Sequence, residues 1–253
     1  MYAAERQAAI VDRARVDGRV EVTALAEMLD VTAETVRRDL TELERQGVLK
    51  RVHGGAIPIE RLGYDSPVSQ RETELPEEKL RIAKAALSEV PQEGAIALDA
   101  GTTTLRLAEL LPVDRELNVV TNGLSHAMLL STRPNLSVHL VGGRIRPRTL
   151  ATVDEGGRSA LEDLFVDVAF LGANGISVEH GLTTPDRSEA STKQALIRAA
   201  GRTVVLADHS KFGVDHFATF GTLAEVDAIV TDAGIEAGLA ADVEAAGPRV
   251  IRA

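Results

Sequence analysis

The hydrophobic positions near the amino terminus recur at helical spacing in short segments. In the first segment, residues 4–16, the pattern predicts a helix that ends at Asp17-Gly18. A short extended stretch follows at 19–22, and Thr23 is placed to cap a second helix. The apolar positions of these two helices that we expect to be buried are Ile10, Val11, Ala14, Leu25, Met28 and Leu29.

The next segment predicts a helix suited to enter a DNA groove. Thr32 is a good N-cap, Glu34 suits the positive end of the helix dipole, and Gly47 is placed to end the helix. The tight turn "LDVT" joins this helix to the previous one, as in a helix-turn-helix, and "VLKRVHGGA" then predicts a hairpin that serves as a wing. The buried face is predicted to consist of Ala33, Val36, Leu40 and Leu43.

Beyond a stretch with several prolines and glycines, apolar runs alternate with helical patterns. Short runs rich in Val, Ile, Leu and Ala that are separated by helices predict a largely parallel sheet covered on both faces, an α/β fold. The pattern divides the chain into a DNA-binding domain at 1–57, a linker at 58–76 and an α/β domain at 77–253. The predicted strands are 95–99, 118–122, 137–143, 166–172, 203–210 and 226–232.

Composition narrows the class of protein. The 253 residues contain no cysteine, so neither disulfides nor thiolate metal sites are expected. No apolar run approaches the roughly 20 residues of a membrane helix, and the start of the chain lacks the layout of a signal peptide. The six histidines are scattered without metal-ligand spacing. We therefore expect a cytoplasmic protein with no membrane partner, no metal, no cofactor and no catalytic residues.

Charge is distributed unevenly along the chain. The net charge of −10 argues against nucleic acid, but five Lys or Arg face three Asp or Glu within residues 36–51. A solvated, salt-bridged surface helix is the alternative; the turn spacing together with the exposed arginines and a basic wing favours DNA binding. Thr35 and Arg38 are candidates for base edges, and Arg37, Lys50 and Arg51 for phosphates. The candidate DNA-binding residues are Thr32, Glu34, Thr35, Arg37, Arg38, Lys50, Arg51 and His53.

Polar residues follow the predicted strands of the α/β domain, where parallel sheets bind ligands. Gly101 lets the backbone approach a ligand, and Thr102–Thr104 begin a helix, which suits a phosphate. Asp99, Asn122 and Asn174 carry oxygen or amide groups that can bind sugar hydroxyls. Lys193 and Lys211 lie near these strand ends and suit a phosphate as compact charges. A purely structural role for such turns is the alternative at each position.

The ordered set of motifs resembles the DeoR/GlpR family of bacterial transcriptional regulators over almost the whole chain. The first domain carries "VTAETVRRDLTELERQGVLKRVHGGA", in which Thr32 replaces the commoner Ser and Val36 the commoner Ile. The second carries, in the family's order, "LDAGTTT", "VVTN", "LVGG", "FLGANGI", "GLTT" and "LADHSKFG".

The resemblance implies a winged helix-turn-helix joined to a Rossmann-like α/β sensor domain similar to phosphosugar isomerases. It also implies a repressor of sugar-uptake or catabolic genes that binds double-stranded operator DNA and is released by a phosphorylated sugar. "FLGANGI" and "HGLTTPD" look most like the branch that serves fructose, so a fructose phosphate is the expected effector. By matching positions, the effector site consists of Asp99, Gly101, Thr102, Thr103, Thr104, Thr121, Asn122, Gly142, Gly143, Lys193 and Lys211.

Two other functions compete with a ligand-released repressor. One is a phosphosugar isomerase with a DNA-binding appendage, in which Asp99 would act as the base. The other is a constitutive DNA-binding protein whose larger domain binds nothing. Because no second catalytic carboxylate accompanies Asp99, we expect a regulator and not an enzyme. Symmetric operators favour a homo-oligomer, either a dimer or a tetramer.

Overall fold

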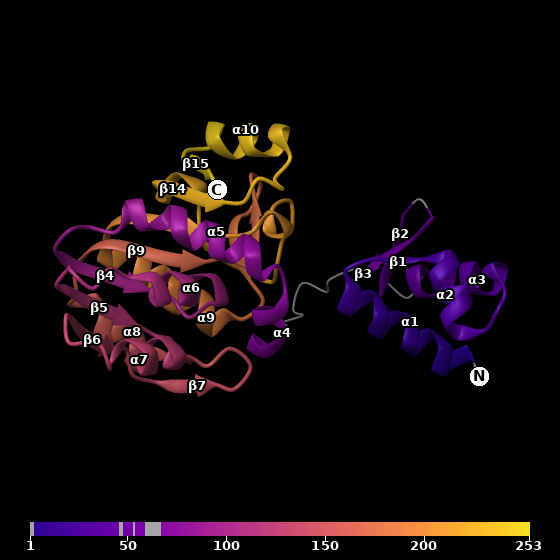
Figure 1. Cartoon of the computed structure of the whole chain (residues 1–253), viewed down its shortest axis with the longest axis horizontal. Coiled ribbons are helices and arrows are strands. Elements are labelled where there is room, and N and C mark those ends of the chain that lie inside the picture. The colour runs from indigo at the N-terminus through magenta and orange to yellow at the C-terminus, as the bar shows by residue number, and fades with distance from the viewer. Residues whose placement is uncertain (1–2, 46–47, 53, 59–66) are drawn as a thin grey trace. The chain divides into compact units, whose positions relative to one another are not determined.

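The computed structural model describes residues 3–45, 48–52, 54–58 and 67–253 (Figure 1). The chain divides into two compact units, Met1–Tyr64 and Asp65–Ala253, each of which is described by itself below. Gly47, the predicted end of the third helix, lies outside the described residues.

The smaller unit is a helical core with a three-stranded sheet. Its strands are ordered β1-β3-β2, and both pairings are antiparallel. Gly54 has a φ of +80° in the turn between β2 and β3, a conformation that favours glycine. The predicted helices, turn and hairpin are therefore present, as a winged helix-turn-helix. Its elements are α1 (Ala3–Asp17), β1 (Val20–Glu21), α2 (Val22–Leu29), α3 (Ala33–Arg45), β2 (Leu49–Val52) and β3 (Gly55–Pro58).

Two details of the second helix differ from the prediction. The helix begins at Val22, so Thr23 is not its cap; the Val22 N–H instead donates to Gly54 O at 2.9 Å, because β1 runs directly into α2 beside the wing turn. This earlier start places Val22 on the buried face with Leu25 and Leu29. Met28 lies on another side of the helix than Leu25 and Leu29 and is 49% exposed, not buried as predicted.

The larger unit is built on a seven-stranded sheet whose described pairings are all parallel, as predicted for an α/β fold. The strand order is β15-β14-β12-β9-β4-β5-β6. Its strands are β4 (Gly94–Leu98), β5 (Leu117–Thr121), β6 (Leu136–Leu140), β9 (Val166–Gly172), β12 (Ala200–Leu206), β14 (Ala228–Thr231) and β15 (Arg249–Arg252).

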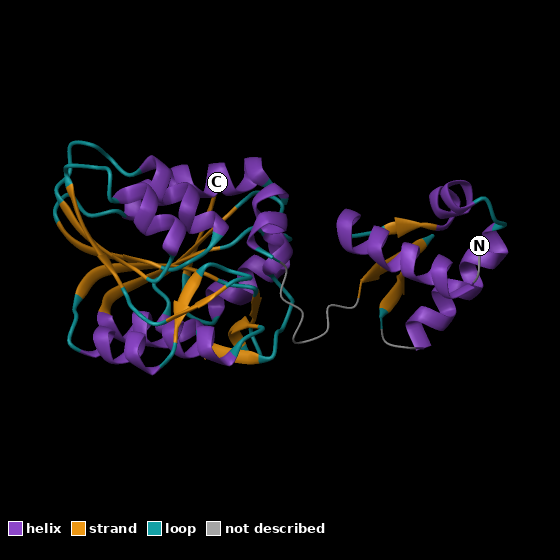
Figure 2. Cartoon of the chain, turned by 90° about the horizontal axis from the view of Figure 1, so that it is seen from below, coloured by secondary structure: helices purple, strands orange, loops and turns teal. Residues whose placement is uncertain are grey.

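Helices cover both faces of this sheet (Figure 2). On β4, Ile96 and Leu98 point into the apolar cluster beneath α5, α6 and α7, whereas Ala97 belongs to the opposite cluster beneath α8, α9 and α10. This alternation buries the strands on both faces and explains their continuous apolar sequences. The helices are α5 (Pro76–Ala86), α6 (Thr102–Leu110), α7 (Leu124–Leu130), α8 (Glu155–Glu162), α9 (Arg187–Ala199) and α10 (Ala237–Ala245).

Smaller elements surround the sheet. One two-stranded and one three-stranded antiparallel sheet lie outside it, with orders β7-β8 and β10-β11-β13. Short 3₁₀ helices occupy Leu87–Glu89, His209–Lys211 and Leu223–Glu225. The strands of these sheets are β7 (Arg144–Arg146), β8 (Ala151–Val153), β10 (Gly175–Ser177), β11 (Gly181–Thr184) and β13 (Ala218–Gly221).

The stretch at 58–76 that the sequence predicts as a linker contains regular structure in its described parts. Residues Val68–Thr73 form the helix α4, and Pro58 belongs to β3. The Val68 N–H donates to Arg148 O at 2.8 Å, and Lys79 Nζ donates to Arg71 O. These bonds attach α4 to the larger unit, so the low periodicity of this stretch reflects a short docked helix.

Candidate functional site

The exposed side of α3 presents the arginines that the sequence predicts for DNA. The side chain of Arg38 is 81% exposed and that of Arg37 is 55% exposed. Both lie beside Glu34, at 3.9 and 3.4 Å, in pairs of the i,i+4 and i,i+3 type that contribute little in water. These arginines are therefore available to an incoming phosphate or base edge.

The start of α3 and the wing position the remaining candidates. Thr32 caps the helix, since its Oγ1 accepts from the Thr35 N–H at 3.2 Å, and the two threonine hydroxyls are 2.9 Å apart. On β2, Arg51 Nη1 donates to Thr41 Oγ1 of α3 at 3.2 Å, which places this wing residue beside the helix. His53 and the side chain of Lys50 lie outside the described residues.

Asp39 is a buried acid that the sequence pattern places on the charged part of α3. It is 4% exposed and accepts from Arg6 Nε at 2.5 Å and from Gln7 at 3.2 Å. The ion pair joins α1 to α3. It also neutralises Asp39, one of the three acidic residues within 36–51 that oppose DNA binding. The exposed surface of α3 is thus more basic than its sequence suggests.

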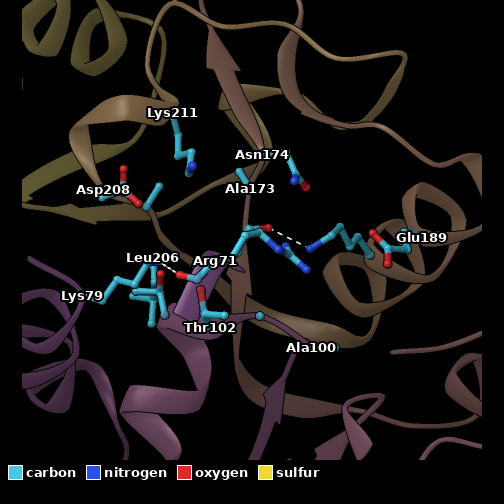
Figure 3. A pocket seen from close by; sticks show the side chains of 15 residues that line it. Arg71, Lys79, Ala100, Thr102, Ala173, Asn174, Glu189, Leu206, Asp208 and Lys211 are labelled. Carbon is cyan, nitrogen blue, oxygen red and sulfur yellow. Dashed lines mark hydrogen bonds between the residues drawn. The ribbon is translucent and has the colours of Figure 1, made fainter. Parts of the chain in front are cut away.

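In the larger unit a pocket lies where the strand order reverses. The chain runs from β4 outward through β5 to β6, then returns to β9 on the other side of β4 and continues to β12. Such switch points are the usual ligand sites of parallel α/β sheets. The pocket measures about 520 Å³, including space open to solvent. Its lining residues are Arg71, Lys79, Ala100, Gly101, Thr102, Thr103, Gly172, Ala173, Asn174, Glu189, Lys193, Leu206, Ala207, Asp208 and Lys211 (Figure 3).

The lining combines several cations with the start of a helix. Thr102 and Thr103 form the first turn of α6, whose backbone N–H groups have no acceptor within the helix. Arg71, Lys79 and Lys211 come from three different segments and line the same pocket as this turn (Figure 3). Backbone donors and cations together make a site for an anion such as a phosphate group.

Arg71 lies in this pocket with unused hydrogen-bonding capacity. Its Nε and Nη2 atoms are buried and have no hydrogen-bond partner in the described part of the chain. A buried donor without a partner costs about 1–3 kcal/mol, so an acceptor from a ligand would remove a real penalty. Lys211 is half-buried, and among the described residues nothing bonds to its ammonium group.

Lys79 is a buried lysine at the side of the pocket. Burial lowers the pKa of its ammonium group to about 8, with Lys211 adding to the effect and Asp208 opposing it. Its Nζ donates to the backbone oxygens of Arg71 and, at 2.6 Å, of Glu74. An anion in the pocket would favour the charged form of this lysine.

Asp99 and Lys193 form a buried ion pair at the wall of the pocket, which Lys193 lines. Lys193 Nζ donates to Asp99 Oδ2 and to Gly172 O, the latter at 2.8 Å, and lies 5.2 Å from the centre of the Phe220 ring. Asp99 is 1% exposed and also accepts from the Gly172 N–H at 3.2 Å. Burial raises the pKa of the Asp99 carboxyl, and Lys193 opposes that change. Asp99 does not line the pocket, and its carboxylate bonds to Lys193 and to the end of β9.

Several predicted effector residues lie beside the pocket and shape it. Thr104 Oγ1 donates to Asp99 O at 2.6 Å, and Thr121 Oγ1 donates to Leu98 O at 2.7 Å. Asn122 Oδ1 accepts from the Ala100 N–H at 2.9 Å. Because these bonds tie the polar atoms to the end of β4 and to the loop at 99–101, the three side chains support the site and do not line it.

Gly142 and Gly143 lie after β6, two strands from the pocket, and do not line it. Gly143 has a φ of +135°, and a Cβ there would lie 2.4 Å from Val153 O. Its glycine is explained by close packing against β8. Of the predicted effector set, the structure thus brings Gly101, Thr102, Thr103, Asn174, Lys193 and Lys211 to the pocket wall.

Sequence reasoning missed Arg71, Lys79, Glu189 and Asp208. Lys79 is one of only five lysines, the signal that identified Lys193 and Lys211, but it lies in a helix far from the strand ends in sequence. Asp208 follows β12 directly and accepts from the Ser210 N–H at 3.1 Å. Arg71 offered no signal, because it falls in the predicted linker.

Two absences hold for the described residues. Within 3–45, 48–52, 54–58 and 67–253, no group of three or more His, Cys, Asp or Glu side chains is arranged to bind a metal ion. Over the same ranges, no helix is long and apolar enough to span a membrane.

Two family descriptions match the chain, one for each unit. Residues 6–61 match the DeoR-like helix-turn-helix domain, and residues 74–233 match the DeoR C terminal sensor domain. Among solved structures, ribose 5-phosphate isomerase A from Methanocaldococcus jannaschii aligns at 20% identity over 54% of each chain, with a TM-score of 0.41 that is too low to support an argument.

Curated relatives match nearly the full length. The HTH-type transcriptional regulator GlpR of Haloferax volcanii is 38% identical over 252 residues, which cover 99% of this chain and 98% of the relative. The glycerol-3-phosphate regulon repressor of Escherichia coli is 32% identical over 233 residues, 92% of each chain. The chain belongs to the DeoR family of DNA-binding transcriptional regulators.

Proposed function

We propose that this regulator binds operator DNA through α3 and the β2–β3 wing, and that a phosphorylated sugar or polyol bound at the switch-point pocket weakens this binding. The observation that carries the proposal is the set of unsatisfied donors around the first turn of α6. Arg71, Lys211 and the α6 backbone all offer donors to one anion.

The remaining pocket wall suits the polar part of such a ligand. Asn174 and Asp208 line it and carry amide and carboxylate groups that can bond to hydroxyls. A phosphomonoester with several hydroxyls therefore matches the pocket better than an apolar ligand does. A fructose phosphate is our first candidate, and glycerol 3-phosphate is the second because the Escherichia coli relative is named for its regulon.

For DNA, Arg38 and Thr35 are proposed to reach base edges and Arg37 and Arg51 to contact phosphates. Their placement on the exposed side of one helix and its adjoining wing supports this assignment. Two-fold operators require two such units, so we propose that the protein acts as a homo-oligomer on DNA, in the cytoplasm.

We propose no isomerase activity for the chain. The base considered from the sequence, Asp99, is 1% exposed and paired with Lys193, so it cannot reach a substrate carbon in the pocket. Fold alone does not assign an activity in any case.

Isothermal titration calorimetry against fructose 1-phosphate, fructose 6-phosphate, glycerol 3-phosphate, free fructose and inorganic phosphate tests the ligand class. We expect at least one phosphorylated compound to bind and free fructose not to bind. Operator shifts on the protein's own upstream region should then weaken with the same compound. Binding of free fructose alone, or of no compound, would overturn the proposed ligand class.

A further inference from the structure

The short helix α4 is held to the larger unit at both of its ends. At its start, the Val68 N–H donates to Arg148 O at 2.8 Å. At its end, Lys79 Nζ donates to the backbone oxygens of Arg71 and Glu74. Leu75 follows with φ 47° and ψ 51°, a left-handed conformation that is uncommon for a residue with a side chain and that turns the chain sharply into α5.

The same helix contributes a wall of the pocket. Arg71 lines the pocket with Thr102, Thr103 and Lys211 (Figure 3). Its Nε and Nη2 atoms are buried without a partner in the described part of the chain, although its backbone oxygen is bonded. The guanidinium fork is therefore the part of α4 that a ligand would change most, because a phosphate can accept from two of its N–H groups at once.

A second route joins the pocket to α4. Glu189 lines the pocket and accepts from Arg146 Nη1 at 2.7 Å and from Thr149 Oγ1 at 2.5 Å. Between these two residues lies Arg148, whose oxygen holds the Val68 N–H. The segment 146–149 thus connects a charged wall residue of the pocket to the first turn of α4.

We propose that α4 is the element that reports pocket occupancy to the DNA-binding unit, with the Arg71 guanidinium closing on the phosphate of the ligand. In the chain, α4 is the first described helix after the boundary between the two units at Tyr64 and Asp65, so among the described helices of the larger unit it is the nearest in sequence to the DNA-binding unit. This inference rests on the proposed function. It adds a division of labour: Lys211 binds the ligand, whereas Arg71 binds it and also couples it to DNA.

The test separates affinity from coupling by comparing Arg71→Ala with Lys211→Met. For each variant, calorimetry gives the Kd of the phosphorylated sugar that binds the wild type. Fluorescence anisotropy then gives operator affinity without ligand and at saturating ligand. Coupling is the ratio of the two operator affinities, typically about 5–150-fold in allosteric proteins.

We expect both variants to bind the ligand about 10–100-fold more weakly, as for loss of a charge-assisted hydrogen bond. At saturation, Lys211→Met should retain the wild-type ratio, whereas the ratio of Arg71→Ala should fall to within about twofold of one. Arg81→Ala, which removes an exposed arginine of α5 paired with Glu78, is the matched control and should change neither quantity. Arg71→Lys keeps the charge without the fork and should recover affinity more than coupling.

Hydrogen exchange provides a readout that does not depend on DNA. Amides of 68–74 should exchange at least several-fold more slowly in the ligand-saturated wild type and Lys211→Met, but not in Arg71→Ala. If Arg71→Ala keeps the full coupling ratio at saturation, the role of α4 is wrong while the proposed function stands. If no phosphorylated compound binds the wild type, both are wrong.

Discussion

Two cationic sites in the described part of the chain differ in how far their charged groups are exposed to solvent. On α3, Arg37 and Arg38 are exposed and share the single carboxylate of Glu34 across 3.4 and 3.9 Å. In the pocket, Lys79 is buried, and Arg71 buries two guanidinium nitrogens that have no partner among the described residues. The first site keeps its charges solvated, whereas the second has lost part of its hydration before any ligand arrives.

The difference matches the two kinds of partner that we propose. DNA is a long polyanion, and solvated arginines on an exposed helix face gain affinity by releasing its counterions, an effect that salt weakens. A small phosphomonoester makes few contacts, so its affinity depends on hydrogen-bond donors that are already in position before it binds. We therefore expect salt to weaken DNA binding strongly and ligand binding much less.

The largest effect is expected from breaking the buried pair at the wall of the pocket. Asp99→Asn leaves the Lys193 ammonium buried without its counter-charge, which should cost the larger unit about 3–5 kcal/mol. This loss corresponds to a fall in Tm on the order of 10 °C. Differential scanning calorimetry is the method of choice, because the chain has no tryptophan whose fluorescence would report unfolding.

The matched control for that change lies in the exposed site. Glu34→Gln removes the acid beside Arg37 and Arg38 and should change stability by no more than about 0.5 kcal/mol. A similar loss from both substitutions would contradict the contrast between buried and exposed charges.

The next effect concerns the ligand alone. Lys211→Met removes a charge that no described residue uses and should raise the Kd for the phosphorylated ligand about 10–100-fold, or about 1.4–2.7 kcal/mol. The same variant should shift Tm little without ligand, because its ammonium supports no bond in the described structure. Calorimetric titration and scanning together check both parts.

We expect Arg38 and Arg51 to contribute differently to DNA binding, Arg38 to sequence discrimination and Arg51 to overall affinity. Arg38→Ala should lose about 1–3 kcal/mol of discrimination between operator and unrelated DNA, since its side chain is 81% exposed at the proposed base-reading surface. Arg51→Ala should weaken both DNAs equally and lower the salt slope by about one. Anisotropy titrations at several salt concentrations measure both, and equal loss of discrimination in the two variants would reverse our assignment.

The last effect is a pH dependence of ligand affinity, which stays within about tenfold up to pH 9. Burial lowers the pKa of Lys79 to about 8, and a bound phosphate would raise it again, so binding above pH 8 must take up a proton. The affinity for the ligand should be constant from about pH 7 to 8 and should then fall by up to tenfold per pH unit as Lys79 loses its proton. Below about pH 6, protonation of the ligand's phosphate should also weaken binding. Without ligand, stability of the larger unit should rise as pH increases from 8 towards 10.5, because the unfolded chain binds the proton more tightly there.

Calorimetric titrations from pH 6 to 10 check this dependence. Lys79→Arg, which stays charged across that range, should abolish the alkaline fall while leaving the acid limb. Persistence of the alkaline fall in Lys79→Arg would show that another group titrates.

The sequence predicted the smaller unit in detail because its signals are local. The Thr32 cap, the apolar face of Val36, Leu40 and Leu43, and the wing glycine each depend on residues within one turn of helix or one hairpin. The error at Thr23 arose where β1 and the wing turn set the start of α2. That contact joins Val22 to Gly54, far beyond the reach of periodicity.

The pocket was predicted only in part. Gly101, Thr102, Thr103 and Lys211 could be predicted because they lie in the short segments that follow β4 and β12. Thr121 and Asn122 lie at a strand end too, yet the strand order turns them towards the backbone of the neighbouring loop. A linear pattern shows that a strand ends in polar residues but does not show which strands are neighbours.

By itself, the sequence determined the class of fold, the family and the helix-turn-helix, and it predicted the turn at Gly101–Thr103 that we propose binds a phosphate, because each rests on short-range pattern and ordered motifs. Only the tertiary structure decided that Asp99 is sequestered by Lys193, that Asp39 is removed from the DNA surface by Arg6, and that α4 brings Arg71 to the pocket. Those are pairings between distant residues, and burial fixes the chemistry of a charged group more than its identity does.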